Sequence, residues 1–104
     1  MAQFDVYTNP ILAARRAYPR VVVLQSDFAQ ALREQIVAPL VPRAHIRDVA
    51  GRLTPIVLLG SEEQVVLVPA MAGVRTRDLL EHHGTLLAAR NELLAAIDYL
   101  FFGI

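Results

Sequence analysis

The sequence of 104 residues contains no cysteine and five scattered glycines. Without cysteine, the chain forms no disulfide bond and offers no thiolate as a nucleophile or metal ligand. Without a glycine-rich loop, it lacks the usual backbone cradle for a nucleotide phosphate. These absences exclude disulfide-stabilised scaffolds and the common nucleotide-binding motifs.

Long uncharged hydrophobic runs are absent as well. Residues 1–5 lack the charged segment and apolar run that begin a signal peptide. The most apolar stretch, residues 86–104, is interrupted by Arg90, Asn91, Glu92 and Asp98, which makes it a poor membrane span. We therefore expect a cytoplasmic protein without a membrane partner.

Groups that could support catalysis are few. His82 and His83 are adjacent, and on a helix they would point about 100° apart, so they form no natural chelating pair. Ser26–Asp27 and Ser61–Glu62 are typical of turns, and neither serine has a recognisable base beside it. The sequence thus predicts no catalytic residue, no metal site and no cofactor.

Hydrophobic residues make up 55% of the chain, which is enough to form the core of one domain over residues 1–104. Such a small domain has apolar surface left over, and a homodimer would bury it. The net charge is zero, but residues 1–52 carry seven basic and four acidic residues. All ten basic residues are arginine. This preference reflects either codon usage or a surface that binds carboxylates and phosphates.

Short runs rich in β-branched and aromatic residues predict strands at residues 4–8, 20–25, 35–38, 56–60, 64–69 and 72–75. Residues 20–25 are apolar on both faces, as in a central strand, and Pro39 should end the next strand. Residues 11–17 form a helical turn or a loop. A helical pattern begins at Asp78 and is strongest over residues 85–102. This order predicts an α+β, mainly β fold: a twisted antiparallel sheet or half-barrel covered by a long C-terminal helix.

The expected terminal helix has two different faces. Its apolar stripe consists of Leu86, Leu93, Ile97, Leu100 and Ile104, flanked by Leu87, Leu94 and Phe101, and is wide enough for a core or a dimer seam. Its opposite face holds Asn91, Ala95, Asp98 and Phe102. The helical wheel therefore predicts that Phe101 belongs to the core. Phe102 either tucks against a strand or serves as a contact for a partner, and Gly103 lets the backbone leave the helix.

Six fragments, in order, resemble the CcdB family of plasmid and chromosomal toxins. They are QFDVYT (3–8), VLQSD (23–27), VAPL (37–40), TPIV (54–57), MAGV (71–74) and NELLAAIDYLFFGI (91–104). The resemblance implies a non-enzymatic homodimer with an SH3-like fold and a long C-terminal helix. It also implies a toxin of a CcdA/CcdB-type system, which binds the DNA gyrase A subunit and traps gyrase on cleaved DNA.

The resemblance further implies that a CcdA-like antitoxin neutralises the toxin and that their complex represses its own operon, so that DNA is contacted only through the antitoxin complex. The residues that would contact gyrase are Asp98, Phe101, Phe102, Gly103 and Ile104 on the helix, and Ser26, Phe28 and Ala29 in a loop. The family has tryptophan where this chain has Phe102, and asparagine where it has Asp98.

An acidic antitoxin tail would find cations in two irregular segments, at Arg15, Arg16, Arg43 and Arg47. Alternatively, these four arginines are scattered over the surface and simply solvated. Two other functions remain open. One is a protein of this fold that binds antitoxin with little or no effect on gyrase. The other is an endoribonuclease of the MazF type, because MazF proteins share the SH3-like fold.

Overall fold

The computed structural model describes residues 1–29, 32–49 and 51–104. Within these residues lie seven strands: β1 Asp5–Thr8, β2 Arg20–Val23, β3 Glu34–Pro42, β4 Ile56–Leu59, β5 Glu62–Val66, β6 Ala72–Arg75 and β7 His82–Thr85. One α-helix, α1 Arg90–Phe102, closes the chain. Short 3-10 turns connect these elements: η1 Leu12–Ala14, η2 Asp27–Ala29, η3 Arg43–His45, η4 Gly51–Leu53, η5 Val68–Ala70, η6 Thr76–Asp78 and η7 Leu87–Ala89.

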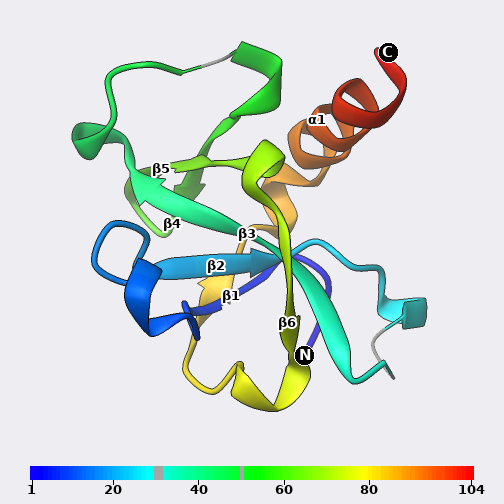
Figure 1. The fold of residues 1–104 in the computed structure, drawn as a ribbon. Coiled ribbons are helices and arrows are strands. Elements are labelled where there is room, and N and C mark those ends of the chain that lie inside the picture. The colour runs from blue at the N-terminus through cyan, green and yellow to red at the C-terminus, as the bar shows by residue number, and fades with distance from the viewer. Residues whose placement is uncertain (30–31, 50) are drawn as a thin grey trace.

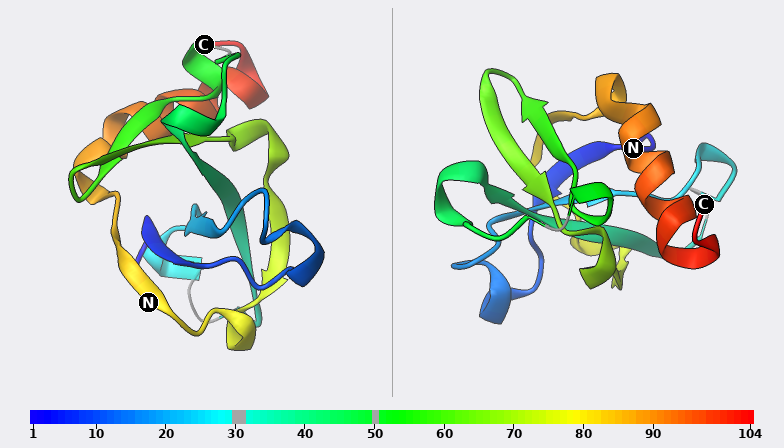
Figure 2. Two further views of the ribbon diagram at one scale, coloured as in Figure 1. Left: turned by 90° about the vertical axis from the view of Figure 1, so that its left-hand side faces the viewer. Right: turned by 90° about the horizontal axis from the view of Figure 1, so that it is seen from above.

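The strands form one antiparallel sheet in the order β4-β5-β3-β2-β1-β7, with β6 paired to β3 outside this path. The sheet curls into a half-barrel, and α1 lies across one side of it (Figures 1 and 2). This architecture confirms the predicted α+β, mainly β fold. The expected hairpin is also present, because β4 and β5 pair around a turn in which Gly60 has a positive φ of 63°.

Strand β3 is longer than predicted, because Pro39 lies inside it and does not end it. β3 pairs with β6 up to Val37 and with β5 from Leu40 onward. Pro39 lies between these two partners, where its missing N–H interrupts neither ladder. Its carbonyl accepts a hydrogen bond from the N–H of Leu67 at 2.9 Å. The prediction that the strand stops at Pro39 was therefore wrong.

The helical pattern predicted from Asp78 was also wrong in its first part. Residues 82–85 form β7, which pairs with β1, and Gly84 has a φ of +112° that no helix accommodates. The α-helix begins at Arg90, five residues later than expected, after the single turn η7. Pairing with an edge strand across the sheet thus overrode the local helical preference.

Side chains on the two faces of the sheet form separate cores. The first core lies between the sheet and α1 and includes Phe4, Leu40 and Leu93, all completely buried. The second core lies on the other face and includes Tyr7, Val23 and Leu79. Strand β2 contributes to both, since Val22 belongs to the first and its neighbours to the second. Its prediction as a central strand, apolar on both faces, is confirmed.

Candidate protein-binding site

The last turn of α1 presents its apolar side chains to solvent. Phe101 is 61% exposed, Phe102 is 72% exposed and Ile104 is 77% exposed, whereas Leu93 earlier in the helix is completely buried. Asp98 is exposed on the same turn. The predicted core position of Phe101 was therefore wrong, because α1 extends past the sheet on which its earlier turns pack (Figure 1). Leu87, in η7, is also exposed, although its neighbour Leu86 is buried in the first core.

Backbone geometry fixes the direction in which the chain leaves α1. Gly103 has a positive φ of 72°, and its N–H donates a hydrogen bond to the carbonyl of Tyr99 at 3.0 Å. This is the left-handed ending that glycine adopts without steric cost. The prediction that Gly103 ends the helix is confirmed, and Ile104 is thereby turned away from the helix axis.

A residue that the sequence analysis did not identify holds this ending in place. Arg52, in η4, donates a hydrogen bond from Nη2 to the main-chain oxygen of Ile104 at 2.9 Å. Its guanidinium carbon also lies 4.3 Å from the centre of the Tyr99 ring, in a cation–π contact. Arg52 therefore restricts both the ending and one side of the last turn.

A shallow cavity connects this turn with the chain before η2. It has a volume of about 280 Å³ and is lined by Leu24, Gln25, Ile36, Met71, Ile97 and Phe101. Phe101 thus contributes to an apolar surface shared with the segment that precedes Ser26. This surface is a candidate contact area, because contiguous exposed apolar groups mark interaction sites.

The predicted loop residues lie on the same side of the molecule but away from the tip of α1. Ser26 and Phe28 are exposed, and the Phe28 side chain is as open to solvent as in an extended chain. The N–H of Ala29 donates to the carbonyl of Ser26 at 2.9 Å, and Asp27 accepts a hydrogen bond from the main-chain N–H of Gln3 at 2.7 Å. The structure therefore places the loop and the helix end as two separate exposed patches (Figure 1).

The four arginines predicted to receive an acidic tail are not equivalent. Arg15 donates to the carbonyl of Asn9 at 2.8 Å, and Arg43 donates to the carbonyl of Ile46 at 2.7 Å. Both side chains thus stabilise their own loops. Arg16 and Arg47 are exposed. Among the described residues, no hydrogen bond or ion pair joins the loop of Arg15 to the loop of Arg43.

The histidines belong to β7, not to the start of a helix. His82 lies 3.4 Å from a carboxylate oxygen of Asp5, and its ring is in a T-shaped arrangement with the Tyr7 ring, with the ring centres 5.4 Å apart. His83 is 2.7 Å from the hydroxyl of Thr8. Across residues 1–29, 32–49 and 51–104, no three potential ligands come together to hold a metal ion. Over the same ranges, no helix has the length and hydropathy needed to cross a membrane.

The fold and this surface define a small half-barrel protein that presents an apolar helix end to solvent. A family model described as CcdB protein matches residues 3–103. No curated protein is similar enough to the chain to match it. Because the family model covers nearly the whole sequence, the chain belongs to the CcdB family, the toxins of CcdA/CcdB-type toxin–antitoxin systems.

Proposed function

We propose that this protein is a toxin that binds the DNA gyrase A subunit and traps the complex of gyrase with cleaved DNA. The observation that carries the proposal is the exposed apolar ending of α1, formed by Phe101, Phe102 and Ile104. Removing each of these side chains from water would contribute about 1.5–3 kcal/mol to binding. Aromatic anchors on a rigid helix also lose little conformational entropy on binding.

The rest of the proposed gyrase surface surrounds these three residues. Asp98 lies about one turn before Phe102, Gly103 directly follows α1, and Ser26, Phe28 and Ala29 form the separate loop patch. A partner that contacts both patches must span them, which suits a large protein surface better than a small ligand. Phe28 is the aromatic group best placed to anchor such a partner in the loop.

Further parts of the proposed function concern regulation. We infer a cytoplasmic homodimer that an acidic CcdA-like antitoxin neutralises, and whose complex with the antitoxin represses the operon. Arg16 and Arg47 support antitoxin binding best, because their guanidinium groups are exposed. Arg15 and Arg43 would contribute through the loops that they stabilise.

A gyrase cleavage assay tests the main proposal. The wild-type protein should make linear DNA accumulate in the presence of gyrase and ATP, and Phe102→Ala should abolish most of this effect. Leu80→Ala is the matched control, because Leu80 is similarly exposed but lies in the connection before β7. If cleaved DNA does not accumulate with the wild-type protein, the proposal is wrong.

A second candidate is a protein of this family that binds the antitoxin but does not poison gyrase. The identity of Phe102 favours it, because phenylalanine lacks the indole N–H that tryptophan provides at this position of the family. The carboxylate of Asp98 adds a charge to the same turn. Phe102→Trp discriminates between the candidates: toxicity that appears only in this variant would show that the scaffold is competent and its anchor is weakened.

A further inference from the structure

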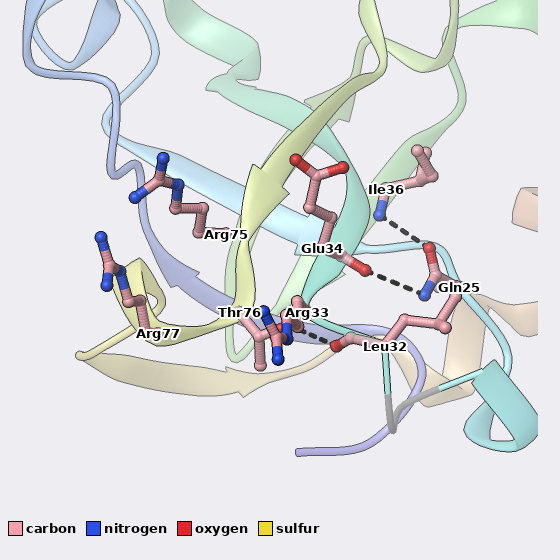
Figure 3. A pocket seen from close by; sticks show the side chains of 8 residues that line it. All are labelled: Gln25, Leu32, Arg33, Glu34, Ile36, Arg75, Thr76 and Arg77. Carbon is pink, nitrogen blue, oxygen red and sulfur yellow. Dashed lines mark hydrogen bonds between the residues drawn. The ribbon is translucent and has the colours of Figure 1, made fainter.

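Three arginines line a larger cavity at the free end of the β3–β6 ribbon. The cavity has a volume of about 1200 Å³, and its lining includes Arg33, Arg75 and Arg77 together with Leu32, Glu34 and Ile36 (Figure 3). The two strands are held together here by a hydrogen bond of 2.8 Å from the N–H of Thr76 to the carbonyl of Arg33. We call this cavity the arginine groove.

The guanidinium groups of the arginine groove have no anionic partner within the part of the chain that the structure describes. Glu34 lies directly opposite Arg75 in the strand register, yet no ion pair joins them. Cations gathered around one cavity repel each other, and a bound anion would relieve this repulsion. The groove therefore favours a ligand that carries negative charge.

The arrangement of the arginines favours phosphate as the anionic group. In Figure 3, Arg75 and Arg77 extend to the same side of the ribbon, and Arg33 directly precedes the neighbouring strand β3. Guanidinium groups form bidentate hydrogen bonds with phosphate oxygens. A terminal phosphate offers three acceptor oxygens, so it can bind two arginines at once more readily than a carboxylate with its two oxygens. Side chains would thus replace the glycine-rich backbone loop that this sequence lacks.

The rest of the lining fits the organic part of a nucleotide. Leu32 is 59% exposed and Ile36 is 39% exposed, and in Figure 3 both lie on the side of the groove away from Arg75 and Arg77. A planar base can bury its apolar face against such side chains. The carboxylate of Glu34 can accept hydrogen bonds from sugar hydroxyls or from base amino groups. A nucleotide therefore uses both parts of the lining, whereas inorganic phosphate uses one.

We propose that the arginine groove binds a nucleotide, either free or as one residue of a single-stranded RNA. Arg75 and Arg77 hold one phosphate, Arg33 pairs with a second, and the base packs on Leu32 and Ile36. Pockets for small organic ligands commonly enclose about 300–1000 Å³, so the volume of the groove is sufficient for a nucleotide. The proposal does not depend on gyrase binding, because none of these residues belongs to the proposed gyrase surface.

Isothermal titration calorimetry with the purified full chain, in a buffer without divalent cations, tests the proposal. The probes are ADP, pyrophosphate, which lacks the sugar and base, and adenosine, which lacks the phosphates. We expect ADP to bind, and pyrophosphate and adenosine each to bind at least about tenfold more weakly, because each contacts one part of the lining only. Absence of ADP binding, or binding of pyrophosphate as tight as that of ADP, would overturn the proposal.

A ten-residue oligoadenylate distinguishes the two sources of the nucleotide. Phosphates that pair with arginines release counterions, so three such contacts predict that the logarithm of the binding constant falls with the logarithm of salt concentration at a slope of about −2. Binding that is tighter than that of ADP and has this slope identifies an RNA strand as the ligand. Tighter binding of ADP identifies a free nucleotide.

Two double variants distinguish the arginine groove from general charge effects. Arg75→Gln with Arg77→Gln should weaken ADP binding about tenfold or more, because both guanidinium forks on the phosphate are lost. Arg20→Gln with Arg90→Gln removes the same charge from β2 and α1 and should change binding less than about twofold. Leu32→Ser should weaken the binding of ADP but not that of pyrophosphate. Thermal melting verifies that the variants are folded, and equal weakening by the two double variants would contradict a site in this groove.

Discussion

The middle and the last turn of α1 both carry apolar residues but have opposite surroundings. Leu93 and Ala96 are completely buried against the sheet, whereas Phe101 and Phe102 are mostly exposed one to two turns later. The difference arises because the helix continues after its packing surface ends (Figure 2). The buried middle and the exposed last turn therefore have different surroundings along a single helix, and substitutions in these two parts should affect different measurements.

Leu93→Ala should have the largest effect on folding. The substitution leaves a cavity in the first core, and such changes lower the free energy of unfolding by about 2–5 kcal/mol. Urea denaturation followed by circular dichroism measures the change. Leu87→Ala is the matched control, because Leu87 is exposed in η7, and it should lower stability by less than about 0.5 kcal/mol. Similar losses of unfolding free energy in the two variants would contradict the distinction between buried and exposed positions.

Phe102→Ala should show the reverse pattern. The free energy of unfolding should change by less than about 0.5 kcal/mol, because the ring contributes little to the core. If the proposed gyrase contact is correct, affinity for the gyrase A subunit should fall by about 2 kcal/mol or more, which is roughly 30-fold. Isothermal titration calorimetry with that purified gyrase chain measures this loss. A variant that loses stability but retains the affinity for gyrase would show that the last turn is structural.

Arg52→Met should have a smaller effect, confined to the exposed end. It removes the hydrogen bond to Ile104 and the cation–π contact with Tyr99, which together contribute about 1 kcal/mol at an exposed site. We expect faster hydrogen exchange at the N–H of Gly103, and gyrase affinity a few-fold lower. Arg16→Met is the control, since Arg16 lies in the loop around η1. If both variants exchange at the wild-type rate, Arg52 does not restrain the ending.

The helical period could identify the faces of α1 but not how far along the helix the sheet buries them. Phe101 falls in line with Leu87 and Leu94, so the wheel predicts one common environment for all three. Burial also depends on where the sheet ends, and this is set by strand register far away in the chain. The periodicity placed Phe102 on the polar face but did not decide whether its ring tucks against a strand, and the structure leaves the ring 72% exposed. The helical period therefore assigned a face to each phenylalanine without deciding its burial.

Long-range pairing explains the remaining differences between prediction and structure. Pro39 lies at the exchange of partners between β6 and β5, which no local pattern reveals. Residues 82–85 become a strand because β1 offers an edge. Arg52 and Ile104 are separated by 52 residues, and nothing in the sequence around either one predicts their contact. The cavity lined by Arg33 and Arg75 likewise depends on the register between β3 and β6.

The smallest expected effect concerns the second core, on the face of the sheet that α1 does not cover. Burial raises the pKa of Tyr7, and the negative charge of Asp5 raises it further. At pH values above the pKa of tyrosine in the unfolded chain, the unfolded state therefore loses this proton before the folded state does. The contribution of the Tyr7 proton to the free energy of unfolding should thus be fully present below the pKa of unfolded tyrosine. It should be lost as the pH rises through the pKa of folded Tyr7. This titration weakens the sheet without changing either end of α1.

Melting temperatures of the wild type and Tyr7→Phe between about pH 8 and pH 11 measure this contribution. The variant should lose stability less steeply at the alkaline end, because the other two tyrosines, Tyr18 and Tyr99, are common to both proteins. Hydrogen exchange at Gly103 should remain equal in the two proteins while both are folded, because Tyr7 and the last turn of α1 belong to different clusters. Parallel pH profiles would show that the proton on Tyr7 does not contribute to folding, and altered exchange at Gly103 would show that the two regions are coupled.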